Sequence, residues 1–176
     1  MGHGTRSIEE FLTILREAGI HRLVDVRTAP GSRKHPQFGQ EELEASLHAQ
    51  GIDYVWRKDL GGWPRPRPDS PHVAIRSAGF RGYADHMDPA EFDRAIRWLI
   101  ETSADVATAI MCAESVWWRC HRRMIADALI ARGSTVVHLM AEGKREPHRL
   151  HEASRFDGTR VVYDRFGSAE QQLLAT

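Results

Sequence analysis

Two cysteines lie eight positions apart in a segment that also carries a carboxylate, a histidine and arginines. Cys112 and Glu114 follow an apolar run, and Cys120 stands directly before His121 and Arg122. A cysteine that leaves a buried strand just before a helix can have its thiolate stabilised by backbone N–H groups, the helix dipole and nearby arginines. We therefore predict a nucleophile or ligand at Cys112 and an acid/base at Glu114, with His121 and Arg122 in support.

Two alternatives remain open for the cysteines. Cys112 is equally well read as an unreactive buried residue at a strand end. On one continuous helix the Cα atoms of Cys112 and Cys120 would be about 12 Å apart, so a redox pair or a metal site requires a turn at residues 112–116. The remaining metal ligands would then come from His121, His138 or the pair His148 and His151. The spacing matches no standard zinc pattern, and no cofactor is otherwise predicted. A phosphatase-like cradle fits poorly, because no glycine lies between Cys112 and Arg119.

A basic loop follows a buried carboxylate earlier in the chain. Asp25 and Arg27 end a β-branched run, and Arg33 comes shortly after. Arg27 and Arg33 would bind a phosphate or carboxylate while Asp25 orients an arginine. The compatible alternative is that Asp25 and Arg27 form an ion pair that only fixes the loop.

Aromatic and cationic residues alternate in a proline-rich stretch. Trp63 stands among Arg57, Arg65 and Arg67, a pattern typical of surfaces that bind single-stranded nucleic acid. The alternative is a surface loop with incidental arginines.

Helices and short apolar strands alternate along the chain and must position these residues. Strands are expected at 22–26, 53–56, 106–111 and 135–139, and helices at 7–18, 40–50, from 90 after an Asp88 cap, and up to Arg132. This order favours an α/β fold, a single compact domain over residues 1–155 with a mainly parallel, Rossmann-like sheet flanked by helices. Residues 156–176 form a C-terminal extension with a strand-like piece at 161–163. Ligands of such sheets bind beyond the carboxyl ends of the strands, which would gather Arg27, Gly61, Gly62, Cys112 and His138.

Composition restricts the class of protein. The 24 basic and 24 acidic residues cancel, and only three of the basic residues are lysines. Bulk positive charge is therefore not the source of affinity, although arginines can still form a local anion-binding face. Two cysteines are too few for a disulfide scaffold. The absence of a long apolar run predicts a cytoplasmic protein without membrane contact, and the oligomeric state stays open.

Several short motifs, in this order, resemble a known family. They are Gly2-His3, Asp25-Val26-Arg27 with Pro30 and Ser32-Arg33, Leu60-Gly61-Gly62, Phe80 with Tyr83 and Met87, and Met111-Cys112-Ala113-Glu114 followed by Cys120-His121-Arg122. Together they are similar to the family called domain of unknown function 488, and the match spans roughly residues 2–140. The resemblance implies a compact α/β protein and groups Cys112, Glu114, Cys120, His121 and Arg122 as a unit, but it names no substrate.

The predicted site combines the residues and the resemblance. Its catalytic members are Cys112, Glu114 and His121; its anion-binding members are Arg27, Arg33, Gly61, Gly62, Tyr83 and Arg122; its supporting members are His3, Asp25, Cys120 and His138. The leading hypothesis is a small cysteine-dependent hydrolase or transferase that acts on an anionic molecule. The alternatives are a nucleic-acid-binding or processing module resembling DNA-repair proteins, and a Cys/His metal-binding or redox-sensing protein through Cys112, Cys120 and His121.

Overall fold

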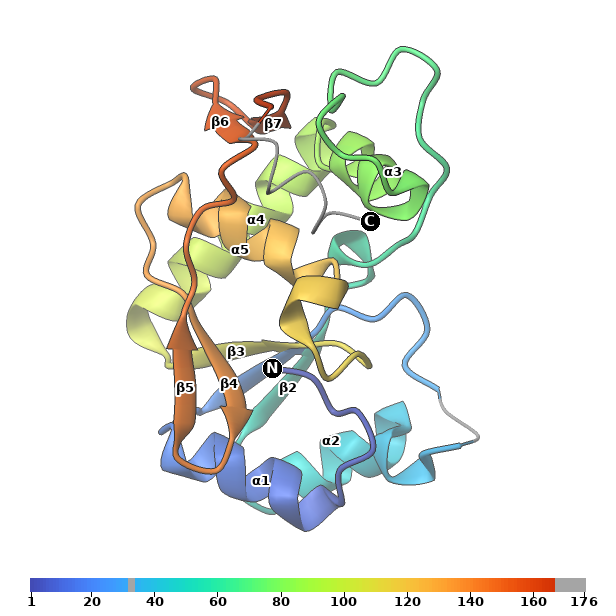
Figure 1. Cartoon of the computed structure of the whole chain (residues 1–176). Coiled ribbons are helices and arrows are strands. Elements are labelled where there is room, and N and C mark those ends of the chain that lie inside the picture. The colour runs from blue at the N-terminus through green and yellow to red at the C-terminus, as the bar shows by residue number, and fades with distance from the viewer. Residues whose placement is uncertain (32–33, 167–176) are drawn as a thin grey trace.

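A three-stranded parallel sheet lies at the centre of the chain, whose computed structural model describes residues 1–31 and 34–166 (Figure 1). Strand β1 (Arg22–Asp25) pairs on one side with β2 (Asp53–Trp56) and on the other with β3 (Thr108–Met111). The register aligns Asp25 with both Trp56 and Met111. The carboxyl ends of the three strands therefore meet at one edge, as the sequence predicts.

Helices cover both faces of this sheet (Figure 1). Helices α1 (Ile8–Glu17) and α2 (Gln40–His48) lie on one face, and α3 (Ala78–His86), α4 (Ala90–Asp105) and α5 (Arg122–Ile130) lie on the other. Successive side chains of β1 point to opposite faces. Leu23 packs with the α1 and α2 core, whereas Val24 packs with the core of the other three helices, so β1 is buried on both sides.

The start of α1 follows from its sequence. The Ser7 side chain accepts a hydrogen bond from the backbone N–H of Glu10, and the Glu10 carboxylate accepts one from the backbone N–H of Ser7. This capping box satisfies N–H groups that a helix start leaves free. The predicted helix and its cap are confirmed. By contrast, Asp88 does not cap α4, because its carboxylate pairs with Arg67 and Arg160.

The expected fourth parallel strand is wrong. Strand β4 (Val137–Ala141) pairs antiparallel with β5 (Lys144–Pro147) and not with the central sheet. Gly143 turns the chain back between them at φ 62°, and Val137 is 44% exposed, whereas a parallel strand is normally buried on both faces. Among the described residues the parallel sheet has three strands, so the mixed α/β fold is confirmed and the Rossmann-like form of the sheet is not.

A second hairpin closes the described chain. Strands β6 (Ser154–Phe156) and β7 (Val161–Tyr163) pair antiparallel, which confirms the strand-like piece at 161–163. Val161 and Tyr163 join the core formed with α3, α4 and α5. The predicted C-terminal extension is thus packed as far as these residues, and its positions 167–176 lie outside the described part. No helix in that part is both long enough and apolar enough to cross a membrane.

Candidate functional site

The segment between β3 and α5 is a loop that brings the two cysteines together. Residues 112–116 are not helical, a short turn η3 (Trp117–Arg119) follows, and α5 begins only at Arg122. The expected long helix up to Arg132 is therefore wrong at its start. The alternative of a turn at residues 112–116 is the one that the structure contains.

Backbone contacts with the first residues of the chain hold this loop. The N–H of His3 donates to the carbonyl of Cys112 at 3.0 Å, and that of Gly4 donates to Ala113 at 2.9 Å. Gly4 has φ 54°, a conformation that favours glycine, and a Cβ there would collide with the Ser115 side chain. In a helix these two carbonyl groups would accept hydrogen bonds from N–H groups of the next turn. Because they accept from His3 and Gly4 instead, the segment does not become helical.

The thiols and their neighbours form a buried cluster. The Nδ1 atom of His121 lies 4.0 Å from the Sγ atom of Cys112 and 3.9 Å from that of Cys120. The Nε of Arg122 donates to Cys120 Sγ at 3.2 Å, and its Nη2 donates to the Glu114 carbonyl. Both cysteines are free thiols. The cluster therefore places a cation against one sulfur, and Arg122 ties that sulfur to the loop.

The two thiols do not titrate alike. A hydrogen bond from Cys112, with contributions from His121 and Arg122, holds the pKa of Cys120 well below its usual value despite burial. The same hydrogen bond and burial raise the pKa of Cys112. The Arg122 guanidinium also lies against Cys120 Sγ at 3.2 Å, and a neighbouring cation stabilises a thiolate. The arrangement therefore favours a thiolate at Cys120 with Cys112 as its donor.

A pocket of about 780 Å³ opens over this cluster at the carboxyl edge of the sheet. Charged residues in its wall include Arg27, Lys34 and Arg119 as cations and Glu114 as the carboxylate. The pocket is also lined by residues from the predicted catalytic set and from the loops after the strands, among them His3, Gly62, Trp63, Cys112, Cys120 and His121. The structure thus gathers at one wall most of the residues that the sequence analysis grouped.

Arg27 reaches the pocket already paired. Its Nε donates to both carboxylate oxygens of Asp25, at 2.9 and 3.0 Å, and its Nη1 donates to the Phe38 carbonyl at 2.8 Å. The Tyr54 hydroxyl adds a 2.8 Å hydrogen bond to the same carboxylate. Arg27 is only 6% exposed. The geometry therefore favours the loop-fixing ion pair over a free anion-binding arginine.

Two glycines follow the short helix η2 (Lys58–Leu60), and they allow this loop to lie close to the end of β1. A Cβ on Gly61 would lie 2.7 Å from the Val26 carbonyl oxygen, and Gly62 has φ 130°. Tyr83 is fully buried, donates its hydroxyl to the Leu60 carbonyl at 2.7 Å and packs 4.8 Å from the His121 ring. Tyr83 therefore supports the cluster from below and does not line the pocket.

His3 and Glu114 lie in the pocket wall. His3 stacks on Phe38 with ring centres 4.3 Å apart, and burial lowers its pKa to about 4, so it is neutral near pH 7. The Glu114 carboxylate accepts the Val116 backbone N–H at 3.1 Å and remains exposed. The Glu114 side chain is therefore open to solvent at the pocket.

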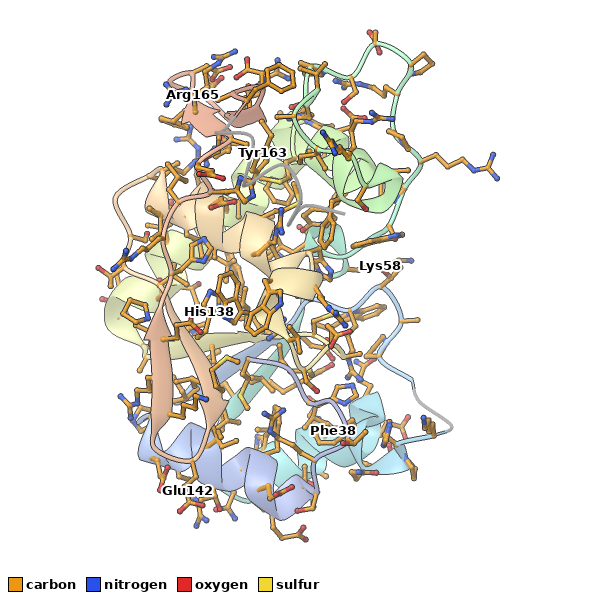
Figure 2. All side chains as sticks on the ribbon, viewed as in Figure 1. Phe38, Lys58, His138, Glu142, Tyr163 and Arg165 are labelled. Atoms are coloured by element: carbon orange, nitrogen blue, oxygen red, sulfur yellow. The ribbon has the colours of Figure 1, made fainter. Side chains whose placement is uncertain are left out.

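His138 does not line this pocket. It lies near the start of β4, at the end of the hairpin that is nearer to α5 (Figure 2). Its Nε2 is 2.9 Å from Nδ1 of His148, whose Nε2 is 3.0 Å from an Asp127 carboxylate oxygen. The Trp117 ring stacks on His138 at 4.0 Å. The structure thus assigns His138 to a buried network with Asp127, which the sequence analysis did not identify because its members are far apart in the chain.

The loops at the carboxyl edge of the sheet carry pocket residues that the predicted site does not include. Arg33 lies outside the described residues. Lys34, Trp63 and Arg119 line the pocket although the predicted site omits them. All three follow or flank the carboxyl ends of strands, so the rule that placed Arg27 there would also have found them.

Comparison with known proteins gives a family and no activity. No curated protein and no solved structure matched the chain. The model of the family described as domain of unknown function DUF488 matches residues 7–129, which contain β1 to β3, the thiol cluster and most of α5. The match covers more than half of the 176 residues, so this chain belongs to the DUF488 family.

Proposed function

We propose that this protein is a cysteine-dependent hydrolase or transferase that acts on a small anionic substrate. The observation that carries the proposal is the 3.2 Å contact between Arg122 Nε and Cys120 Sγ in the wall of a pocket with more cations than carboxylates. A thiolate is the reactive form of cysteine, and a neighbouring cation stabilises it. Cys120 carries the charge, and Cys112 donates to it, which revises the assignment of Cys112 as nucleophile.

The reaction divides into two steps. The Cys120 thiolate forms a bond to an electrophilic atom of the bound anion, and the leaving group departs with its electron pair. Water then attacks the same atom, the bond to Sγ breaks, and the thiolate is restored while Glu114 accepts the proton released by the water. A second substrate with a hydroxyl group in place of water gives transfer by the same sequence.

A metal centre at Cys112, Cys120 and His121 is the second candidate. Their ligand atoms all lie within 4.8 Å of one another, and two cysteines with one histidine can hold catalytic zinc with one position open. Histidine ligands normally donate their second N–H to a partner. The Nε2 of His121 is buried without a partner among the described residues, which supports the thiolate reading over the metal.

Alkylation rates test the proposal. We compare iodoacetamide, which is neutral, with iodoacetate, which is an anion, at about pH 6, where an ordinary thiol is almost fully protonated. The protein should react with iodoacetamide faster than free cysteine does, and the rate ratio of iodoacetate to iodoacetamide should exceed that of free cysteine. Cys120→Ser should abolish the fast reaction, whereas Cys112→Ser should retain it more slowly.

The controls separate the two candidates. Preincubation with a chelator should leave the rates unchanged for a free thiolate and should accelerate alkylation if a metal protects the sulfurs. A wild-type rate that rises only near the pKa of an ordinary thiol, or a fast reaction that survives Cys120→Ser, would contradict the proposed thiolate. An unchanged iodoacetate preference would contradict the anionic substrate.

A further inference from the structure

One wall of the pocket is an exposed indole ring. Trp63 is 54% exposed and lines the pocket. Its ring contacts Phe80 edge-on with centres 5.1 Å apart, and a Cβ on Gly79 would collide with it. The indole is therefore seated on the first turn of α3 while much of its surface faces solvent, as in an aromatic platform for a flat ligand.

The cations that share the pocket with Trp63 differ in whether they are paired. Arg27 is held by Asp25, whereas Lys34 and Arg119 are exposed and form no ion pair with another described residue. These two cations can bind an anion, and the exposed indole of Trp63 can stack on an aromatic group, so the pocket is expected to bind a ligand that carries both.

The arginines near Trp63 do not extend this site into a long track. Arg57 pairs with Asp59 at 2.5 Å and stacks on Trp98 at 4.2 Å, and Arg67 pairs with Asp88 at 2.6 Å. Both guanidinium groups are thus engaged by carboxylates. Arg65 is exposed and does not line the pocket. A groove that follows a nucleic-acid backbone needs successive unpaired cations, and the paired Arg57 and Arg67 on either side of Arg65 interrupt such a series.

We propose that the pocket binds a phosphate-bearing nucleobase compound, with the base on Trp63 and the phosphate at Lys34 and Arg119. This names the substrate class of the proposed cysteine enzyme and rests on that function. The volume of about 780 Å³ lies within the range of sites for small molecules and cofactors. A free nucleotide and a nucleotide within single-stranded nucleic acid both carry a base and a phosphate, so either could occupy such a site.

Calorimetric titration tests the ligand class. The probes are the nucleoside 5′-monophosphates of the common bases, the matching nucleosides, and inorganic phosphate. At least one monophosphate should bind about tenfold or more tightly than either its nucleoside or phosphate, since stacking and charge both contribute. Trp63→Ala should weaken that monophosphate about 5- to 150-fold, the range expected for base–aromatic stacking, and leave phosphate binding unchanged. Trp63→Phe should retain most of the affinity.

Trp118→Ala is the matched control, because Trp118 is 47% exposed but does not line the pocket. The affinity of this variant for the monophosphate should stay within about twofold of the wild-type value. A short single strand that binds more tightly than the monophosphate, with the same dependence on Trp63, would assign the source as nucleic acid, and weaker binding would assign it as free nucleotide. Monophosphates that bind no more tightly than phosphate, or a Trp63→Ala protein with unchanged affinity, would overturn the inference. If the iodoacetate preference persists in that case, the anion-binding thiol enzyme still stands and only its substrate class is wrong.

Discussion

Asp25 is fully buried, and each of its carboxylate oxygens is engaged. It accepts from the backbone and guanidinium of Arg27 and from the Tyr54 hydroxyl. A buried charge of this kind is stable only while its partners remain. The pair fixes Arg27 in the pocket wall and neutralises it, so attraction of an anion falls to Lys34 and Arg119.

Removing the charge of Asp25 should therefore cost much more than removing a similar surface charge. We expect Asp25→Asn to lower the free energy of unfolding by about 3–5 kcal/mol, because Arg27 stays buried without a counter-charge. Asp53→Asn, which breaks an exposed 3.2 Å pair with Arg22 in the neighbouring strand, should cost less than about 1 kcal/mol. Urea unfolding of both variants measures the difference, and equal losses would refute the structural role of the Asp25 pair.

At the scale of elements, the sequence was informative where local pattern decides the structure. The three parallel strands are short apolar runs, and their shared carboxyl edge follows from that assignment. For residues 112–116 local pattern left both a helix and a turn open. Contacts from His3 and Gly4, more than a hundred residues away, decide for the turn by keeping this segment from becoming helix. Likewise, nothing in the apolar run of β4 specified its pairing, which Gly143 directs to the next strand.

The loop that follows η2 lies against the end of β1, which is a second contact between segments distant in sequence. Two glycine substitutions test how closely the loop and the strand are packed. A Cβ on Gly61 would lie 2.7 Å from the Val26 oxygen and 3.0 Å from the Thr28 nitrogen, whereas a Cβ on Gly31 would meet nothing within 4 Å. We expect Gly61→Ala to destabilise the fold by about 1–3 kcal/mol through overpacking against backbone. Gly31→Ala should change stability by less than about 0.5 kcal/mol. Thermal unfolding distinguishes them, and a neutral Gly61→Ala would mean that the loop is free to move away.

At the scale of the whole molecule, one buried network joins three segments that are distant in sequence. The Asp127 carboxylate on α5 accepts from His148 at 3.0 Å and from the Tyr163 hydroxyl of β7 at 2.8 Å, and His148 meets His138 of β4 at 2.9 Å. The contact between His138 and His148 joins the β4–β5 hairpin to the Asp127 carboxylate, and the Tyr163 hydroxyl joins the β6–β7 hairpin to the same carboxylate. The two hairpins therefore depend on the same helix.

Neutral buried histidines make stability depend on pH in a defined direction. Burial, reinforced by His148, lowers the pKa of His138 to about 3, and burial lowers that of His3 to about 4. Unfolding raises these values toward 6.5, so the unfolded chain binds more protons; stability is complete above about pH 6.5 and is lost as pH falls toward the folded values. For each of these histidines, the free energy of unfolding should fall by about 1.4 kcal/mol for every pH unit below that point.

We expect the melting temperature to fall between pH 7 and about pH 5, a window above the ordinary range of carboxyl groups. His138→Gln should make that fall less steep, because one proton fewer is taken up on unfolding. His21→Gln is the control, since His21 is exposed at the start of β1 and its loss should leave the slope unchanged. Scanning calorimetry at several pH values gives the three slopes. A wild-type melting temperature that is constant across this window, or an equal slope in all three proteins, would show that the buried histidines are not held neutral by the fold.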